Sequence, residues 1–233
     1  MHLSLLDPDN PAFPDPNTAL AEPDGLLAVG GNLEPNTLFN AYRQGIFPWY
    51  QDDDPILWWS PATRCLIEPE TLHISSRLRR LLRQKPYQIK TDSDFNRVVK
   101  ACAEPRGDGG TWITEEMIDA YTVLHEQGRA HCVEVWDGSD LVGGIYGVHV
   151  GGIFCGESMF SRVDNGSKIA IAHLCQWMIA EGLEFLDCQL VNPHLMTLGA
   201  ITMPRADFLA HLHSIRDRQH RWSLTDSYAW QWR

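Results

Sequence analysis

The sequence lacks the paired cysteines on which structural metal sites and disulfide frameworks depend. Its six cysteines stand far apart and none forms a C-x-x-C pair; they occupy positions 65, 102, 132, 155, 175 and 188. This spacing argues against a zinc site and, in a chain of 233 residues, against a disulfide-stapled fold. Ten histidines are present, but no H-E-x-x-H motif. We therefore expect no bound metal and a reducing, cytoplasmic environment.

Long apolar runs and a leader segment are also missing. The longest weakly polar run, Leu141 to Gly156, is interrupted by His149 and by glycines, and it is too short for a comfortable membrane span. The first residues, MHLSLLDPDNPAFPDP, do not combine a basic start with an apolar stretch. With 44% hydrophobic and 21% charged residues, the composition predicts a soluble globular protein without a membrane partner. We expect a monomer.

Positive charge is scarce overall, because the net charge is −11, but it is concentrated in one segment. Residues 1–60 carry a net charge of −8, whereas residues 73–90 contain six basic residues and no acid. Leucines at helical spacing predict an amphipathic helix in this segment, capped by Ser75 or Ser76. Its basic face is either an ordinary solvated surface or a track for nucleic-acid phosphates. The candidate phosphate-binding residues are Arg77, Arg79, Arg80, Arg83 and Lys85.

The patterning divides the chain into two regions. Residues 1–64 are rich in proline, glycine and tryptophan and carry one short helix signal, PNTLFNAYRQG, which predicts a small, irregular first domain. Residues 65–233 begin with helical periodicity and alternate as strands from His131 to Phe160. An apolar helix at 167–180, a strand EFLDCQ and a last helix near 204–216 follow. We predict an α+β fold in which helices cover a mainly antiparallel sheet.

This order of elements resembles that of the acetyltransferase-like (GNAT-like) fold. Such enzymes usually carry a glycine-rich pyrophosphate loop of the form Q/R-x-x-G-x-G/A before the main helix, and the corresponding segment here, SRVDNGSK, lacks it. Coenzyme A is therefore not the expected ligand, and we expect no cofactor. The helix start near Gly166 and Lys168 is either a site for another phosphate or a plain helix cap.

Short motifs in family order resemble those of the bacterial leucyl/phenylalanyl-tRNA-protein transferases. They lie between Phe13 and Phe208 and read GLLAVGGNL, AYRQGIFPWY, ILWWSPATR, TWITEEM, AHCVEVW, LVGGIYG, FCGESMFS and FLDCQ. The resemblance implies an enzyme that transfers Leu, Phe or, less well, Met from an aminoacyl-tRNA to the N-terminal Arg or Lys of a protein, which creates a degradation signal. It implies Leu-tRNA and Phe-tRNA as donors, and a small N-terminal domain on a GNAT-like domain.

Three polar residues are the candidates for the chemistry. Asp187 and Gln189 alternate along a predicted strand, so both side chains should lie on one face, and the resemblance places them beside the reacting amine as catalytic residues. Asp187 either removes a proton or only orients Gln189 and the substrate. Glu157 stands in an apolar setting, where a carboxylate selects a cationic acceptor terminus or bonds to backbone amides. The resemblance implies the first role for Glu157 and puts Gly156 at the same substrate site.

The resemblance also implies binding surfaces for the two parts of the donor. The amino-acid pocket falls on six residues that the sequence alone would assign to the core, namely Ile145, Phe154, Ile171, Leu174, Met178 and Leu186. The family pattern has Met at the first of these positions and aromatic residues at the fourth and fifth, so the preference between Leu and Phe stays open. The terminal adenosine is expected to stack on or lie beside Trp49, Trp112, Tyr42 and Tyr121. Core packing is the alternative for the tryptophans.

Two other functions fit the predicted elements. One is an acyl-CoA-dependent N-acyltransferase of the same fold, which the missing pyrophosphate loop disfavours. The other is a non-catalytic RNA-binding protein, which is disfavoured because the basic patch is confined to one helix.

Overall fold

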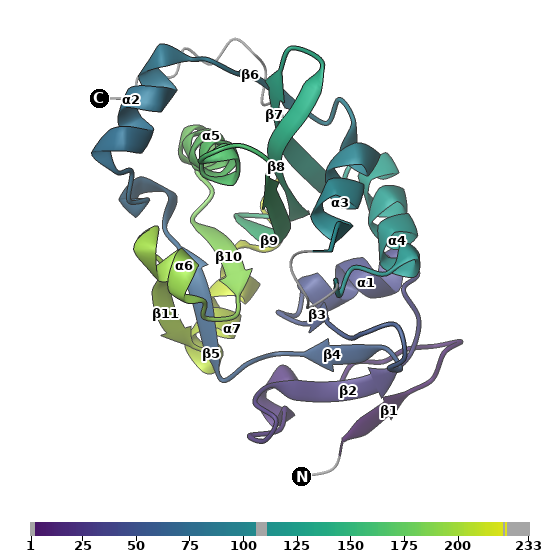
Figure 1. Cartoon of the computed structure of the whole chain (residues 1–233). Helices are drawn as coiled ribbons and strands as arrows, with labels where there is room; N and C mark the ends of the chain where they lie inside the picture. The colour runs from purple at the N-terminus through teal and green to yellow at the C-terminus, as the bar shows by residue number, and fades with distance from the viewer. Residues whose placement is uncertain (1–2, 106–110, 221, 223–233) are drawn as a thin grey trace.

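The computed structural model describes residues 3–105, 111–220 and 222, and it contains two sheets with helices around them (Figure 1). The first sheet has the strand order β1-β2-β4-β3 and is built from the first sixty residues. Its strands are β1 (Ser4–Leu6), β2 (Leu26–Gly30), β3 (Phe47–Pro48) and β4 (Leu57–Trp59). Helix α1 (Pro35–Tyr42) and a short 3-10 turn, Pro16–Thr18, complete this region.

The second sheet has seven strands in the order β11-β5-β10-β9-β8-β7-β6. All neighbouring pairs are antiparallel except β9 and β10, which run parallel. The strands are β5 (Thr63–Ile67), β6 (Gln88–Thr91), β7 (Ala130–Asp137), β8 (Asp140–Val150), β9 (Ile153–Ser161), β10 (Phe185–Gln189) and β11 (Ile201–Pro204). The predicted mainly antiparallel sheet is therefore confirmed.

Helices cover both faces of the large sheet, as Figure 1 shows with α5 on one side and α3 and α4 on the other. On the first side α5 (Gly166–Glu181) is apolar nearly all round, and its buried residues form one core with those of α2 (Ser76–Gln84) and the sheet. On the other side α3 (Phe95–Ala103) and α4 (Glu115–Glu126) share a second core with α1 and α7 (Arg205–Ile215). A short 3-10 turn, Pro69–Thr71, lies between β5 and α2, and helix α6 (Pro193–Thr197) lies between β10 and β11.

The predicted amphipathic helix with its cap at Ser75 is confirmed as α2. Ser75 caps α2 by accepting a hydrogen bond from the backbone N–H of Leu78, and Thr114 caps α4 in the same way. The predicted irregularity of residues 1–64 is wrong, because four short strands there pair into a sheet. Each of these strands has five residues or fewer, which is too short for periodicity to give a signal.

The expected domain division after Arg64 falls inside β5, which belongs to the second sheet. Among the described residues, no helix has both the length and the apolar character needed to cross a membrane.

Candidate active site

The candidate site lies where the parallel strands β9 and β10 separate. The two strands pair over only three residues each, from Ile153 to Cys155 and from Phe185 to Asp187. Just beyond this pairing, the β8–β9 register shifts so that Glu157 is an extra residue, and the β5–β10 register shifts so that Cys188 is an extra residue. Two adjacent bulges therefore re-aim the side chains of Glu157 and Gln189 at the gap between the strands.

Glu157 receives two hydrogen bonds from side chains of separate elements. The Tyr121 hydroxyl donates to Oε2 at 2.7 Å, and Nε2 of Gln189 donates to Oε1 at 2.7 Å. The hydroxyl of Tyr42 lies 2.5 Å from that of Tyr121, which extends the network to α1. Both donors are side chains and neither is a backbone amide, so the structure does not support the alternative role for Glu157, an acid bonded to backbone N–H groups.

The protonation of this cluster is set mainly by burial. Burial raises the pKa of the Glu157 carboxyl to about 7, although the hydrogen-bonding network of Tyr121, Tyr42 and Gln189 acts in the opposite direction. Burial, and then the charge of Glu157, raise the pKa of the Tyr42 and Tyr121 phenols well above the usual value. Both phenols therefore stay protonated, while Glu157 exchanges its proton near neutral pH.

A pH-dependent cost in stability follows for Glu157. The folded protein binds this proton up to about pH 7, whereas an unperturbed glutamate loses it near 4.5, so the free energy of unfolding falls as pH rises between these values. Replacement Glu157→Gln removes this loss. We expect the stability gain of the variant to be about 2 kcal/mol larger at pH 8 than at pH 5, since each pKa unit corresponds to about 1.36 kcal/mol. Urea unfolding at both pH values measures it, and an equal difference at both would contradict the raised pKa.

Asp187 is fully buried and engaged on both oxygens. Nε of Arg64 donates to Oδ1 at 2.8 Å and an Nη donates to Oδ2 at 2.6 Å, while Oδ1 also accepts the backbone N–H of Gln189 at 2.9 Å. Gln189 has a positive φ of 63°. The expected simple alternation of Asp187 and Gln189 is therefore wrong, because the bulge at Cys188 lies between them; a shared hydrogen bond, not the strand period, brings them together.

Arg64 is the site residue that sequence reasoning missed. Its signal in the sequence is a lone charge inside ATRCLI. Arg64 is buried, and a buried arginine within a strand needs a partner of opposite charge. The sequence alone does not say which acid that partner is.

The six residues expected to form the amino-acid pocket are all buried in one cluster between the sheet and α5. Gly156 connects this cluster to the polar network, since a Cβ placed there would lie 3.3 Å from Leu186, 3.7 Å from the carbonyl oxygen of Asp187 and 3.9 Å from Ile145. The apolar cluster and the Glu157 network thus meet at one point of the sheet. Whether the cluster opens for a side chain stays a prediction.

Two of the four aromatic residues expected beside the adenosine line an open groove. Trp49 is 41% exposed, and with Trp112 and Trp59 it borders a cavity of about 320 Å³. Tyr42 and Tyr121 do not reach this groove; both are buried and hydrogen-bonded in the Glu157 network. The structure therefore brings Trp49 and Trp112 together as candidates for stacking and places the tyrosines behind the carboxylate.

The basic side chains of α2 are exposed, as the phosphate-track interpretation requires. Arg77 makes an exposed ion pair with Asp164 at 2.8 Å, just before the start of α5. Arg77 and Arg80 border a cavity of about 210 Å³ together with Asn165, which precedes α5. Arg162, near the same helix start, is paired with Glu104.

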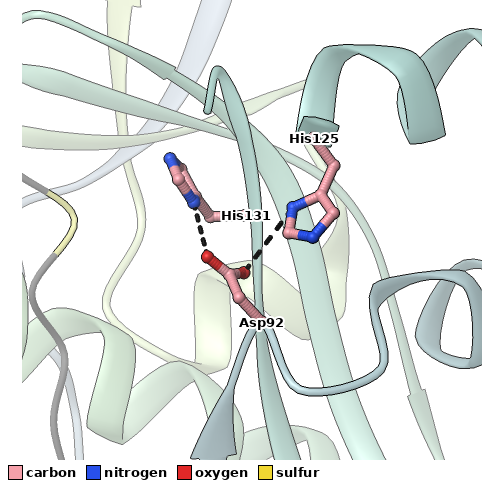
Figure 2. Close-up of side chains that lie close together, drawn as sticks. All are labelled: Asp92, His125 and His131. Atoms are coloured by element: carbon pink, nitrogen blue, oxygen red, sulfur yellow. Dashed lines mark hydrogen bonds and ion pairs between the residues drawn. The ribbon is translucent and has the colours of Figure 1, made fainter. Parts of the chain in front are cut away.

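Asp92, His125 and His131 form the group of potential metal ligands in the described residues, with ligand atoms within 4.8 Å of one another (Figure 2). However, Nδ1 of His131 lies 2.7 Å from Oδ2 of Asp92, a hydrogen-bond distance. Two ligands of one zinc ion would stand about 3.3 Å apart, given bonds of about 2.0–2.1 Å. Nδ1 of His125 faces the carbonyl oxygen of Ala130 at 2.9 Å. We interpret the group as an acid–histidine contact that fixes the loop after β6.

The sequence comparisons with known proteins agree on one family. The sequence profile described as leucyl/phenylalanyl-tRNA protein transferase matches residues 66–213, and the profile of its N-terminal domain matches residues 31–62. A leucyl/phenylalanyl-tRNA--protein transferase of Citrobacter koseri is 48% identical over 95% of this chain and 96% of the relative. That of Photobacterium profundum is 50% identical over 93% and 91%.

Among solved structures, the L-PGS of Bacillus licheniformis is 14% identical over 70% of this chain and 55% of that chain, with a TM-score of 0.37, too low to support a conclusion about fold. The sequence relatives decide the assignment, because they are nearly half identical over almost the whole length. The chain belongs to the leucyl/phenylalanyl-tRNA protein transferase family.

Proposed function

We propose that the protein transfers Leu or Phe, and less well Met, from an aminoacyl-tRNA to the N-terminal Arg or Lys of an acceptor protein. The observation that carries the proposal is the Glu157 network at the gap between β9 and β10, where an ionisable carboxylate meets an apolar cluster. The names of the relatives supply the reaction class. The carboxylate fits a cationic acceptor terminus, and the apolar cluster fits the side chain of Leu or Phe.

The reaction joins an activated ester to an amine. The α-amine of the acceptor attacks the ester carbonyl carbon, a C–N bond forms, and the C–O bond to the ribose oxygen of the tRNA breaks. One proton leaves the amine and one proton ends on the released ribose oxygen. An unperturbed α-amine has a pKa of about 7.7–8.0, so much of the catalytic task is to position it and to accept its proton.

Glu157 and Gln189 are proposed to do this positioning directly. A carboxylate with a pKa of about 7 can accept a proton from an amine near neutral pH or bind the ammonium form. Gln189 is held beside it by the 2.7 Å hydrogen bond. Asp187 has both oxygens engaged by Arg64, so we propose that it orients Gln189 and does not act as the base.

We also propose that the first sixty-odd residues form a small domain on a GNAT-like second domain. The antiparallel strands β7 to β9, the following helix α5 and the parallel strand β10 have the order that this fold requires. The short link between β4 and β5, just before Arg64, supports a division in this part of the chain.

The exposed basic face of α2 is proposed to contact tRNA phosphates. Reversal of Arg79, Arg80 and Arg83 to Glu should raise the KM for aminoacyl-tRNA at least about 10-fold. It should also reduce the slope of log KM against log salt concentration by up to about 3, because each lost phosphate contact lowers this slope by slightly less than 1. Steady-state kinetics at several salt concentrations measures both effects.

The matched control is Lys100→Glu, an exposed charge reversal on α3, away from α2. Its KM should stay within about 2-fold of the original value. An unchanged KM in the α2 variant, or an equal change in the control, would show that this face is an ordinary solvated surface.

The function itself is tested with labelled donors and a peptide that begins with Arg. Leu-tRNA should label the peptide, whereas labelled acetyl-CoA should not, and a peptide that begins with Asp should accept no label. Label from acetyl-CoA would favour the acyl-CoA-dependent rival. Tight tRNA binding without any transfer would favour the RNA-binding rival.

A further inference from the structure

Arg64 is the one arginine that is buried in the part of the chain that the structure describes, with 1% of its surface exposed. A buried guanidinium is costly unless its donors are satisfied. Two of them form the bidentate pair with Asp187, and the other terminal nitrogen donates to the carbonyl oxygen of Gly45 at 3.0 Å. The rings of Phe47 and Phe208 lie 5.0 and 4.6 Å from its central carbon.

These contacts place Arg64 at a junction of three parts of the molecule. Gly45 and Phe47 lie between α1 and β4, Asp187 lies in β10, and Phe208 lies in α7. Arg64 itself belongs to β5, the antiparallel neighbour of β10. The guanidinium therefore sets the position of the Asp187 carboxylate relative to both sheets.

The position of the Asp187 carboxylate affects the backbone of Gln189. Oδ1 of Asp187, held by Arg64, accepts the backbone N–H of Gln189, whose φ of 63° is unusual for a residue other than glycine. Such a conformation persists only when surrounding contacts over-determine it. In that conformation Nε2 of Gln189 reaches Glu157.

We propose that Arg64 is a positioning residue of the transfer site, which acts through Asp187 to hold Gln189 in its left-handed conformation and thereby aims the Gln189 amide at Glu157. The inference rests on the proposed function for its effect on catalysis. The chain of contacts from Arg64 to Glu157 is independent of that function. Removal of the bidentate bond therefore disturbs the transfer step more than the binding of tRNA.

The test compares Arg64→Gln with Arg64→Lys, which keeps the charge but lacks the planar fork. We expect kcat for transfer to fall about 100-fold in the first variant and about 10-fold in the second, because small misplacements of reacting groups lower the rate strongly. The KM for aminoacyl-tRNA should stay within about 2-fold of the original value. Arg64→Lys keeps the test decisive if Arg64→Gln does not fold. An unchanged kcat in folded Arg64→Lys would overturn the proposal.

A second readout separates the inference from the proposed function. The side-chain amide signal of Gln189 in a ¹H–¹⁵N spectrum, assigned by its absence in Gln189→Ala, should titrate with a midpoint near pH 7 because it reports on Glu157. In Arg64→Lys this titration should shift or vanish. An identical titration would overturn the inference even if the protein transfers no amino acid, whereas a lost titration supports it independently of activity.

The matched control is Arg43→Gln. Arg43 also ties the segment after α1 to the chain after α7, through the carbonyl oxygen of Arg216 at 3.2 Å and Asp217 at 2.6 Å. Its side chain bonds to neither Asp187 nor Gln189. The control should keep kcat within about 2-fold and leave the Gln189 titration unchanged. If it reproduced the Arg64 effects, the role of Arg64 would be that of a general structural tie.

Discussion

Replacement of Asp187 by Asn should abolish most of the transfer activity while the affinity for tRNA is retained. The change leaves Arg64 buried without its countercharge, and breaking a buried pair in this way costs about 3–5 kcal/mol of folding stability. It also weakens the acceptor for the backbone N–H of Gln189. We expect kcat to fall at least about 100-fold, as for a displaced catalytic group. Single-turnover transfer at saturating tRNA, together with urea unfolding, measures both effects.

An exposed acid provides the control for this experiment. Asp164 pairs with Arg77 at 2.8 Å, but both side chains are more than two thirds exposed. Asp164→Asn should therefore change stability by less than about 1 kcal/mol and leave kcat unchanged. Equal losses of turnover and tRNA binding in Asp187→Asn would contradict a role for Asp187 in the transfer site.

Removal of both groove tryptophans should weaken the use of aminoacyl-tRNA strongly. Trp49 and Trp112 border the same cavity, and stacking of a base on an aromatic side chain contributes about 1–3 kcal/mol. The double variant Trp49→Ala, Trp112→Ala should raise the KM for aminoacyl-tRNA at least about 10-fold, with kcat changed by less than about 3-fold. Steady-state kinetics over a range of tRNA concentrations measures this.

The stacking interpretation has a distinct salt signature. Loss of stacking should raise KM equally at low and high salt, whereas loss of the α2 charges should act mainly at low salt. Phenylalanine at both positions retains a flat ring and should restore most of the affinity. If the phenylalanine variant were as impaired as the alanine variant, the tryptophans would serve packing in the groove and not base stacking.

The helices and the central meander were predictable because their signals are local. Ser75 stands at the start of α2, and α5 is apolar on nearly every face, so a cap residue identifies the first helix and hydrophobic patterning the second. Strands β7 to β9 alternate and are joined by short turns. The strands of the first sheet were not predicted, because they are short and some of their pairs join residues far apart in the chain, such as Ser4 with Ala28.

The candidate site was predictable in part. Glu157, Asp187 and Gln189 are polar residues in apolar strands, and the structure brings all three into one network. What the sequence could not reveal is the pair of bulges at Glu157 and Cys188, because an extra residue in a strand depends on its partner. The bond between Arg64 and Asp187 was not predictable either, because 123 positions separate the two residues in the chain.

A crystal structure with a non-hydrolysable leucyl-adenosine, linked through an amide at the ribose, tests the central claim most directly. We expect the adenine in the groove between Trp49 and Trp112, the leucyl side chain against Ile145 and Leu186, and the carbonyl group facing Gln189 and Glu157. Electron density for the compound at another surface, with Glu157 and Gln189 still bonded only to each other and to protein, would contradict it.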